Sequence, residues 1–116
     1  MSLNDCIFCK IADGRITSSR VYEDETCVAF DDLTPQSPVH ILIIPRQHLD
    51  SLDSADPEYK EMLGHLLITA ADIARQKGFA KNGYRVVINT NSDGGQTVFH
   101  LHVHLLAGRQ FVFPPG

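Results

Sequence analysis

The chain has 116 residues, of which 43% are hydrophobic and 21% charged, a balance that is typical of globular proteins and excludes disorder as the default state. Its formal net charge of −4 argues against a nucleic acid polymer as the main partner but leaves room for a small phosphorylated ligand in a local pocket. The sequence contains no uninterrupted run of about 18 apolar residues, the length that would predict a membrane span. Residues 1–5 lack the basic and apolar regions of a signal peptide.

The length predicts a single domain over residues 1–116. Three cysteines, an odd number, do not make a disulfide framework in a chain this long. We therefore expect a reducing, cytoplasmic environment.

The first half of the chain predicts three strands. Residues 20–23 and 26–30 are short strand-like segments on either side of a polar turn. Residues 39–44 form an apolar run rich in β-branched side chains that Pro45 closes, which indicates a buried strand.

One long helix follows. Asp56 is its expected N-cap, Pro57 its first helical residue and Glu58 an acid in its first turn. Apolar residues then recur at helical spacing as far as Ala74, and Gly78 is expected to end the helix.

Two further strands are expected at residues 84–89 and 101–107, joined by a glycine-rich turn at 91–95. This connection is too short for a parallel crossover, so the strands should be antiparallel. The sequence therefore predicts an α+β domain, an antiparallel sheet of about five strands with one long helix on a face.

Three histidines alternate with aliphatic residues in the run from His100 to Leu105. In a strand, residues two apart share a face, so His100, His102 and His104 should lie on one side of the sheet. A regular strand would separate the outer pair by roughly 13 Å, too far for one metal ion with bonds of about 2 Å. The three imidazoles should therefore have different tasks.

The run from His100 to Leu106 resembles the signature of the histidine triad (HIT) family of nucleotide hydrolases and transferases. Segments 30–38, 43–48, 92–97 and 108–116 are similar to the Hint branch of that family, the purine nucleoside phosphoramidases. The resemblance covers nearly the whole chain and implies the HIT-like fold, including a short N-terminal helix.

The resemblance implies a role for each site residue. His102 would attack the α-phosphorus, His104 would contact a phosphate oxygen, and Gln96 would lie near the leaving group. A neutral imidazole is nucleophilic near pH 7, which makes the two-step reaction chemically reasonable. The other residues implied to bind the nucleotide are Phe8, Phe30, Asp32, Leu33, His40, Ile43, Asn89, Gly95 and Thr97.

Two of these roles have a structural alternative. Asp32 resembles the acid that binds the ribose hydroxyls, but it could also be a turn aspartate before Pro35. His40 could be a core histidine with satisfied hydrogen bonds. The glycines before the triad would allow the backbone amides of residues 92–97 to form an anion-binding nest.

Cys6 and Cys9 have the two-residue gap of a zinc knuckle, although four ligands are needed for a closed site. His48 and His100 could complete a structural Zn²⁺ site, an arrangement similar to that of several family members. A redox pair is the alternative.

The resemblance thus implies a homodimeric hydrolase of purine nucleoside 5′-phosphoramidates, such as AMP or GMP amides. It would act through a nucleotidyl-histidine intermediate, with no metal needed in the chemical step. A dinucleoside polyphosphate hydrolase, or a nucleotide-binding interaction protein with residual activity, are the alternatives.

Overall fold

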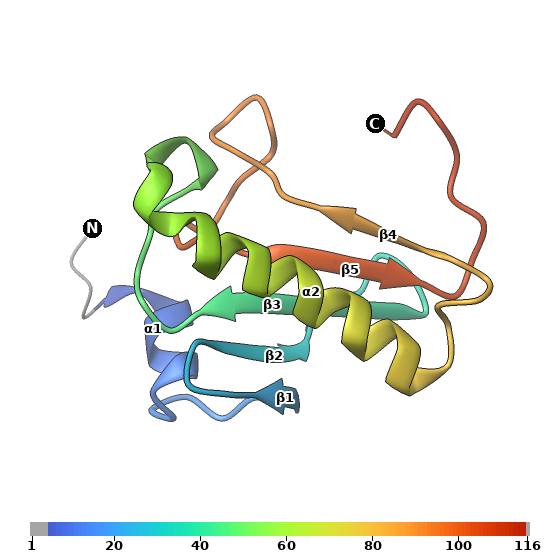
Figure 1. The fold of residues 1–116 in the computed structure, drawn as a ribbon, viewed down its shortest axis with the longest axis horizontal. Helices are drawn as coiled ribbons and strands as arrows, with labels where there is room; N and C mark the ends of the chain where they lie inside the picture. Colours follow the sequence, from blue (N-terminus) through green and yellow to red (C-terminus); the bar gives the residue numbers. More distant parts are fainter. Residues whose placement is uncertain (1–4, 116) are drawn as a thin grey trace.

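One antiparallel sheet of five strands, in the order β1-β2-β3-β5-β4, forms the centre of the computed structural model (Figure 1). The structure describes residues 5–115, so residues 1–4 and 116 of the predicted domain lie outside the described part. The strands are β1 (Arg20–Glu23), β2 (Cys27–Asp31), β3 (Val39–Pro45), β4 (Tyr84–Val87) and β5 (Val103–Ala107). The prediction of an α+β fold is confirmed.

Two helices cover opposite faces of the sheet. The 18-residue α2 (Lys60–Lys77) lies along one face (Figure 1) and packs its apolar side chains, including Leu66 and Ile73, on β3 and β5. The short α1 (Ile7–Ala12) packs on the other face, where Phe8 joins a second cluster with Leu42 and Ile44. The sheet therefore has a helix-side core and an α1-side core.

The C-terminal end of α2 follows from its sequence, but its start does not. Gly78 ends the helix in the left-handed conformation, with φ of 85°, as the glycine predicts. The start differs from the prediction, because Pro57–Tyr59 form a 3₁₀ turn (η3) that Asp56 caps, and α2 begins only at Lys60. A second 3₁₀ turn, η2, spans Leu52–Ser54.

The last two strands are shorter than predicted. β4 stops at Val87 and β5 begins at Val103, so only His104 of the three histidines lies in a regular strand. Leu101 donates its backbone N–H to the carbonyl of Leu49, which lies beyond the end of β3. The chain before β5 therefore bends out of the ladder, which corrects the prediction that all three histidines share one strand.

Strand register decides which side chains face α1. Across β3, β5 and β4, one row joins Leu42, His104 and Val87, and the next joins His40, Leu106 and Arg85. Directly opposed residues of antiparallel strands share a face. Within residues 5–115, no helix is long and apolar enough to cross a membrane.

Candidate active site

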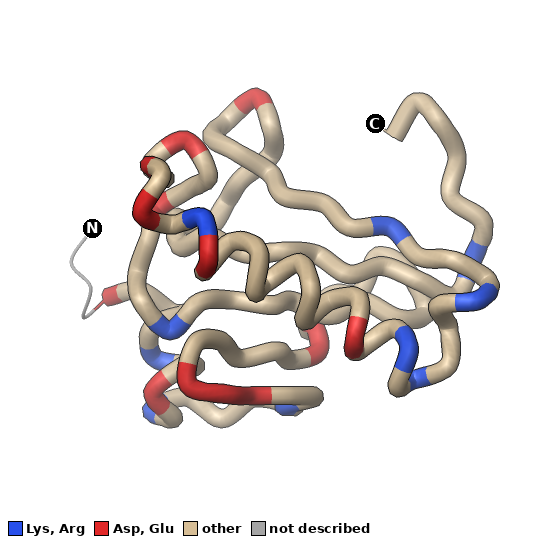
Figure 2. Tube along the Cα trace, in the orientation of Figure 1, with Lys and Arg blue, Asp and Glu red and all other residues tan. Residues whose placement is uncertain are grey.

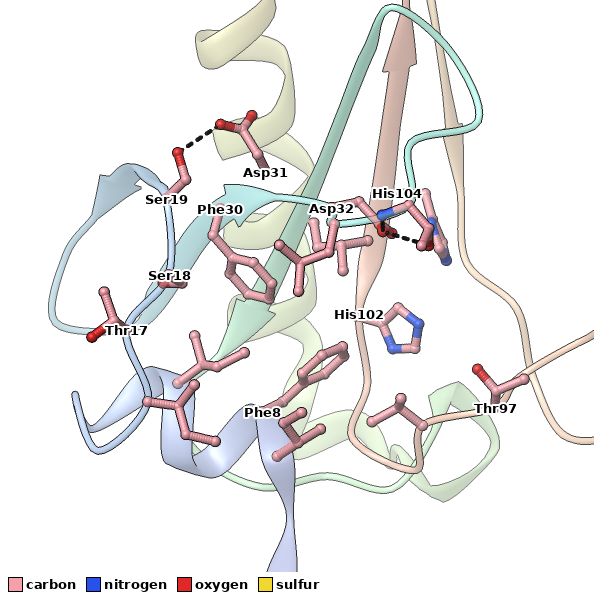
Figure 3. A pocket seen from close by; sticks show the side chains of 17 residues that line it. Phe8, Thr17, Ser18, Ser19, Phe30, Asp31, Asp32, Thr97, His102 and His104 are labelled. Atoms are coloured by element: carbon pink, nitrogen blue, oxygen red, sulfur yellow. Dashed lines mark hydrogen bonds between the residues drawn. The ribbon is translucent and has the colours of Figure 1, made fainter.

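A cavity of about 310 Å³ opens on the α1 side of the sheet, beside the histidines (Figure 3). His102 points into it from above Phe8, and Thr97 closes one side. The lining is mostly apolar on the α1 side and polar near the histidines. Its residues are Ile7, Phe8, Ile11, Ile16, Thr17, Ser18, Ser19, Phe30, Asp31, Asp32, Leu33, Thr34, Leu42, Thr97, Val98, His102 and His104.

The hydrogen bonds of His102 fix its tautomer. Its Nδ1 lies 2.8 Å from the carbonyl oxygen of His100. A carbonyl can only accept, so Nδ1 carries the proton and Nε2 carries the lone pair. Nε2 has no hydrogen-bond partner among residues 5–115. Burial lowers the pKa of His102, so the side chain is neutral near pH 7 and its Nε2 lone pair is not used by another group of the described chain.

A second chain of hydrogen bonds fixes the tautomers of His40 and His104. The backbone N–H of Gln36 donates to Nδ1 of His40 at 3.0 Å, so the proton of His40 is on Nε2. That Nε2–H donates to Nδ1 of His104 at 2.9 Å. His104 must then carry its own proton on Nε2, which is buried and has no partner within the described chain.

The two histidines are held neutral. Burial, followed by the nearby His102 and His40, lowers the pKa of His104 to about 4, although Asp32 opposes the shift. Burial also lowers the pKa of His40, again against Asp32. The orphaned Nε2–H of His104 is thus a neutral donor in a low-dielectric site, a suitable group to meet a phosphate oxygen.

Asp32 makes the turn interaction that the sequence predicts and also lines the cavity. Its Oδ1 accepts from the N–H of Thr34 at 2.8 Å, which is the turn interaction. Its Oδ2 lies 3.5 Å from Nε2 of His40 and faces the cavity. Nearby, Phe8 and Phe30 meet edge to face at 5.7 Å and form the apolar end of the cavity. Leu33 stands at the rim, 96% exposed.

Ile43 does not line the cavity, which corrects its predicted role. Its side chain is 0% exposed and belongs to the helix-side core, whereas the neighbouring Leu42 lines the cavity. Successive residues of a strand face opposite sides, so His40 and Ile43 could not share a face. The alternation of the strand pattern already contained this signal.

The loop before the triad also differs from the prediction. The amide of Gln96 is buried: its Oε1 accepts from the N–H of Asn91 at 2.9 Å, and its Nε2 donates to the carbonyl of Asp50 at 2.7 Å. The backbone N–H of Gly95 donates to Ser92 and that of Gln96 donates to Asn91. Gly95 and Gln96 therefore do not line the cavity, and their backbone amides are already used by the carbonyls of Ser92 and Asn91. The loop needs glycine at 94, where a Cβ would lie 2.5 Å from the carbonyl oxygen of Thr90.

Asn89 lies apart from this cavity. It lines a neighbouring cavity that shares His104 and contains Arg85, Arg109 and Phe111. Sequence reasoning missed the two arginines because no motif marks them. It also missed the polar rim at Thr17, Ser18 and Ser19, which comes from the loop after α1.

The four predicted metal ligands meet at the end of α1. The ligand atoms of Cys6, Cys9, His48 and His100 lie within 4.8 Å of one another. Sγ of Cys6 and Sγ of Cys9 lie 3.3 and 3.5 Å from Nδ1 of His100, and Sγ of Cys9 lies 3.4 Å from Nδ1 of His48. Tetrahedral bonds of about 2.3 Å to sulfur and 2.0 Å to nitrogen require separations of about 3.5 Å. The donor set and its spacing therefore fit Zn²⁺.

The outer partners of these histidines point the right nitrogen at the cluster. Nε2 of His100 donates to the carbonyl of Pro45 at 2.8 Å, and Nε2 of His48 to a carboxylate oxygen of Asp50 at 2.7 Å. Each Nδ1 is then a lone-pair donor toward the sulfurs, which is the usual arrangement around a metal-bound imidazole. Sγ of Cys6 also accepts the N–H of Cys9 as the N-cap of α1.

Comparison with known proteins identifies one family to which this chain is similar. The family model that describes the HIT domain in sequence matches residues 13–111 of this chain. A curated relative, an uncharacterized HIT-like protein of Synechococcus elongatus, is 54% identical over 112 residues, which cover 97% of each chain.

Solved structures are also similar. A HIT family hydrolase from Legionella pneumophila has 46% sequence identity and a TM-score of 0.95, covering 97% of this chain and 100% of its own. A histidine triad protein from Clostridium difficile has 48% identity and a TM-score of 0.91, covering 95% of this chain and 96% of its own.

Proposed function

The chain belongs to the HIT domain family, and on this premise we propose that it is a nucleotide hydrolase of the Hint type. Its substrates are purine nucleoside 5′-phosphoramidates, derivatives of AMP or GMP with an amine on the α-phosphorus. His102 is the nucleophile and a nucleotidyl-histidine is the intermediate. The similarity to the Legionella pneumophila HIT family hydrolase supports the general class of reaction.

One observation carries the proposal. Nδ1 of His102 donates to the His100 carbonyl, and its Nε2 lone pair is left free beside a cavity lined by Phe8 and Asp32. A neutral imidazole fixed in this tautomer is ready to attack an electrophile without first losing a proton.

The reaction has two steps. The Nε2 lone pair of His102 forms a bond to the α-phosphorus while the bond from phosphorus to the amine nitrogen breaks, and the leaving nitrogen takes up a proton. Water then attacks the phosphorus, the bond to Nε2 breaks, and a nucleoside monophosphate and a proton are released. The Nε2–H of His104 donates to a non-bridging phosphate oxygen in both steps.

The remaining cavity residues bind the nucleoside. Phe8, Phe30 and Leu42 enclose the purine, and the free Oδ2 of Asp32 accepts from the ribose hydroxyls. The hydroxyl of Thr97 lies on the side of the α-phosphate. Gln96 acts at a distance by holding its loop in place.

Cys6, Cys9, His48 and His100 hold a structural Zn²⁺ in this proposal. The ion ties α1 to the chain just before β5, and the chemical step uses the histidines alone. None of the three cysteines forms a disulfide within the described residues, and Cys27 lies outside the cluster, which fits a reducing, cytoplasmic compartment.

We also propose a homodimer. β4 is an edge strand of the sheet, and α2 exposes apolar side chains at Leu67 and Ile68, the latter 62% exposed. Pairing of these features between two copies would cover an edge and an apolar patch. Analytical ultracentrifugation that detects only a species with the mass of one chain would contradict the homodimer.

Hydrolysis of adenosine 5′-phosphoramidate by the wild type, His102→Ala and His65→Ala tests the proposed function. We expect turnover by the wild type and by His65→Ala, since His65 lies on α2 away from the cavity, and none by His102→Ala. Preferred cleavage of diadenosine triphosphate would favour the polyphosphate hydrolase instead. AMP binding without turnover of either compound would favour a nucleotide-binding interaction protein.

A further inference from the structure

A second cavity, of about 270 Å³, is lined in part by His104, which also lines the cavity beside His102. The residue that the two cavities share therefore carries the buried Nε2–H that has no partner within the described chain. The polar and charged side chains around the second cavity are Gln36, His40, Arg85, Asn89, His104 and Arg109. Among residues 5–115, no aspartate or glutamate lines it.

Strand register places Arg85 on the same face as the catalytic histidines. Arg85 lies opposite Leu106, which in turn lies opposite His40, while the adjacent row contains His104. The arginine is therefore a neighbour of the His40–His104 pair across the sheet, although it lies 19 positions before His104 in the sequence.

Arg109 reaches the same place from the end of β5. Its guanidinium stacks on the ring of Phe111 at 4.3 Å, and that of Arg85 lies over the same ring at 5.1 Å. Phe111 thus contacts two positive charges, each at cation–π distance from its ring centroid. Like charges repel, so this arrangement needs a compensating anion or solvent.

No carboxylate in the described chain supplies that compensation. Arg85 donates to the carbonyl of Val112 at 2.8 Å, and Arg109 to the carbonyl of Gln36 at 3.3 Å, and neither forms an ion pair within residues 5–115. Carbonyl acceptors orient the guanidiniums but leave their charge uncompensated. β4, β5 and the tail as far as residue 115 contain no Asp or Glu (Figure 2), in a chain whose net charge is −4.

We propose that Arg85 and Arg109 bind an anionic group on the leaving group of the substrate. This inference rests on the proposed function: with the nucleoside in the first cavity and the α-phosphate at His102 and His104, whatever is attached beyond the phosphorus extends into the second cavity. The substrate class is therefore a nucleoside phosphoramidate whose amine also carries a carboxylate or a phosphoryl group. Either anion matches the planar fork of a guanidinium.

Three AMP conjugates test this, joined through nitrogen to glycinamide, glycine or aminomethylphosphonate. They share the scissile P–N bond and differ in the charge beyond it. The wild type should hydrolyse a charged conjugate with kcat/KM about tenfold above that of the glycinamide conjugate, the size expected for one charge-assisted hydrogen bond. The glycine and aminomethylphosphonate arms distinguish a carboxylate from a phosphoryl group as the preferred anion.

In the double variant Arg85→Gln/Arg109→Gln, the ratio of kcat/KM for a charged conjugate to kcat/KM for the glycinamide conjugate should fall close to one. Arg109→Gln alone should lower this ratio by a smaller amount. Lys60→Gln, which removes one positive charge from an exposed position on α2, should retain the full preference. A thermal melt of each variant separates misfolding from loss of recognition.

Failure of this inference is distinguishable from failure of the proposed function. Turnover of all three conjugates by the wild type with equal kcat/KM would overturn the anion site and leave the hydrolase proposal standing. A preference that survives in the folded double variant would also overturn it. No turnover of any conjugate would contradict the proposed function itself.

Discussion

The carbonyl oxygen of His100 accepts a hydrogen bond from Nδ1 of His102 at 2.8 Å, while the imidazole of His100 belongs to the Cys/His cluster. One residue thus links the proposed zinc site to the proposed nucleophile. Its side chain fixes the backbone, and its backbone selects the tautomer of the next histidine.

Loss of zinc should therefore affect both stability and catalysis. In Cys9→Ser we expect less bound zinc, a melting temperature several degrees lower, and a reduced kcat because the His100 carbonyl is less firmly held. Metal analysis, thermal unfolding and phosphoramidate kinetics measure the three effects. Cys27→Ala, at the cysteine outside the cluster, should retain its zinc; wild-type protein purified without zinc and unchanged by its addition would refute the site.

His40 should act as a positioning residue for His104. In His40→Ala, Nδ1 of His104 loses its donor at 2.9 Å, so its tautomer is no longer fixed. We expect kcat to fall about tenfold or more, the range for a group that orients a catalytic donor, with KM little changed. Partial recovery in His40→Gln, whose amide can still donate, would support the role; an equal loss in both variants together with a large rise in KM would argue for a purely structural role.

Leu42 and Ile43 form a matched pair on opposite faces of β3. Leu42→Ala should weaken nucleotide binding because Leu42 lines the cavity. Ile43→Ala should leave AMP affinity nearly unchanged but cost about 2–4 kcal/mol of unfolding free energy, since the side chain is in the helix-side core. Calorimetric titration with AMP and chemical denaturation compare the two; weaker binding in Ile43→Ala alone would restore a nucleotide-binding role for Ile43.

Asp24 should make stability depend on pH. Burial acts to raise the pKa of its carboxyl, but hydrogen bonds from the N–H groups of Cys27 and Thr26, and from His65 and Tyr22, lower it well below the usual range. A carboxylate with a lowered pKa stabilises the fold above its unfolded pKa of about 4, and this stabilisation is lost as pH falls below that value.

Asp24→Asn should therefore destabilise the protein by about 1 kcal/mol at pH 7, the scale of a charge-assisted hydrogen bond at a partly exposed site. The difference from wild type should shrink as pH falls below about 4. Denaturant titrations of both proteins across this range measure it. A difference that is constant with pH would show that the carboxylate charge has no role.

Local pattern was sufficient for much of the fold. The alternation around His100–Leu105, the capping signals at Asp56 and Gly78, and the two-residue gap between Cys6 and Cys9 each depend on residues close in sequence. Together with the apolar runs, those signals identified five strands and one long helix, whereas His48 joined the two cysteines only through its residue type and the family resemblance. The same signals did not predict where the strands end, because pairing with distant segments decides how far a ladder of hydrogen bonds extends. The backbone hydrogen bond from Leu101 to Leu49 is an example.

By itself, therefore, the sequence determined the α+β class and the identity of the chemical groups, because periodicity, caps and residue types are local properties. Only the tertiary structure decided that the Gln96 amide turns inward and that Arg85 and Arg109 meet at Phe111. Each of these depends on strand register and on hydrogen bonds between segments far apart in the chain, which residue order alone does not specify.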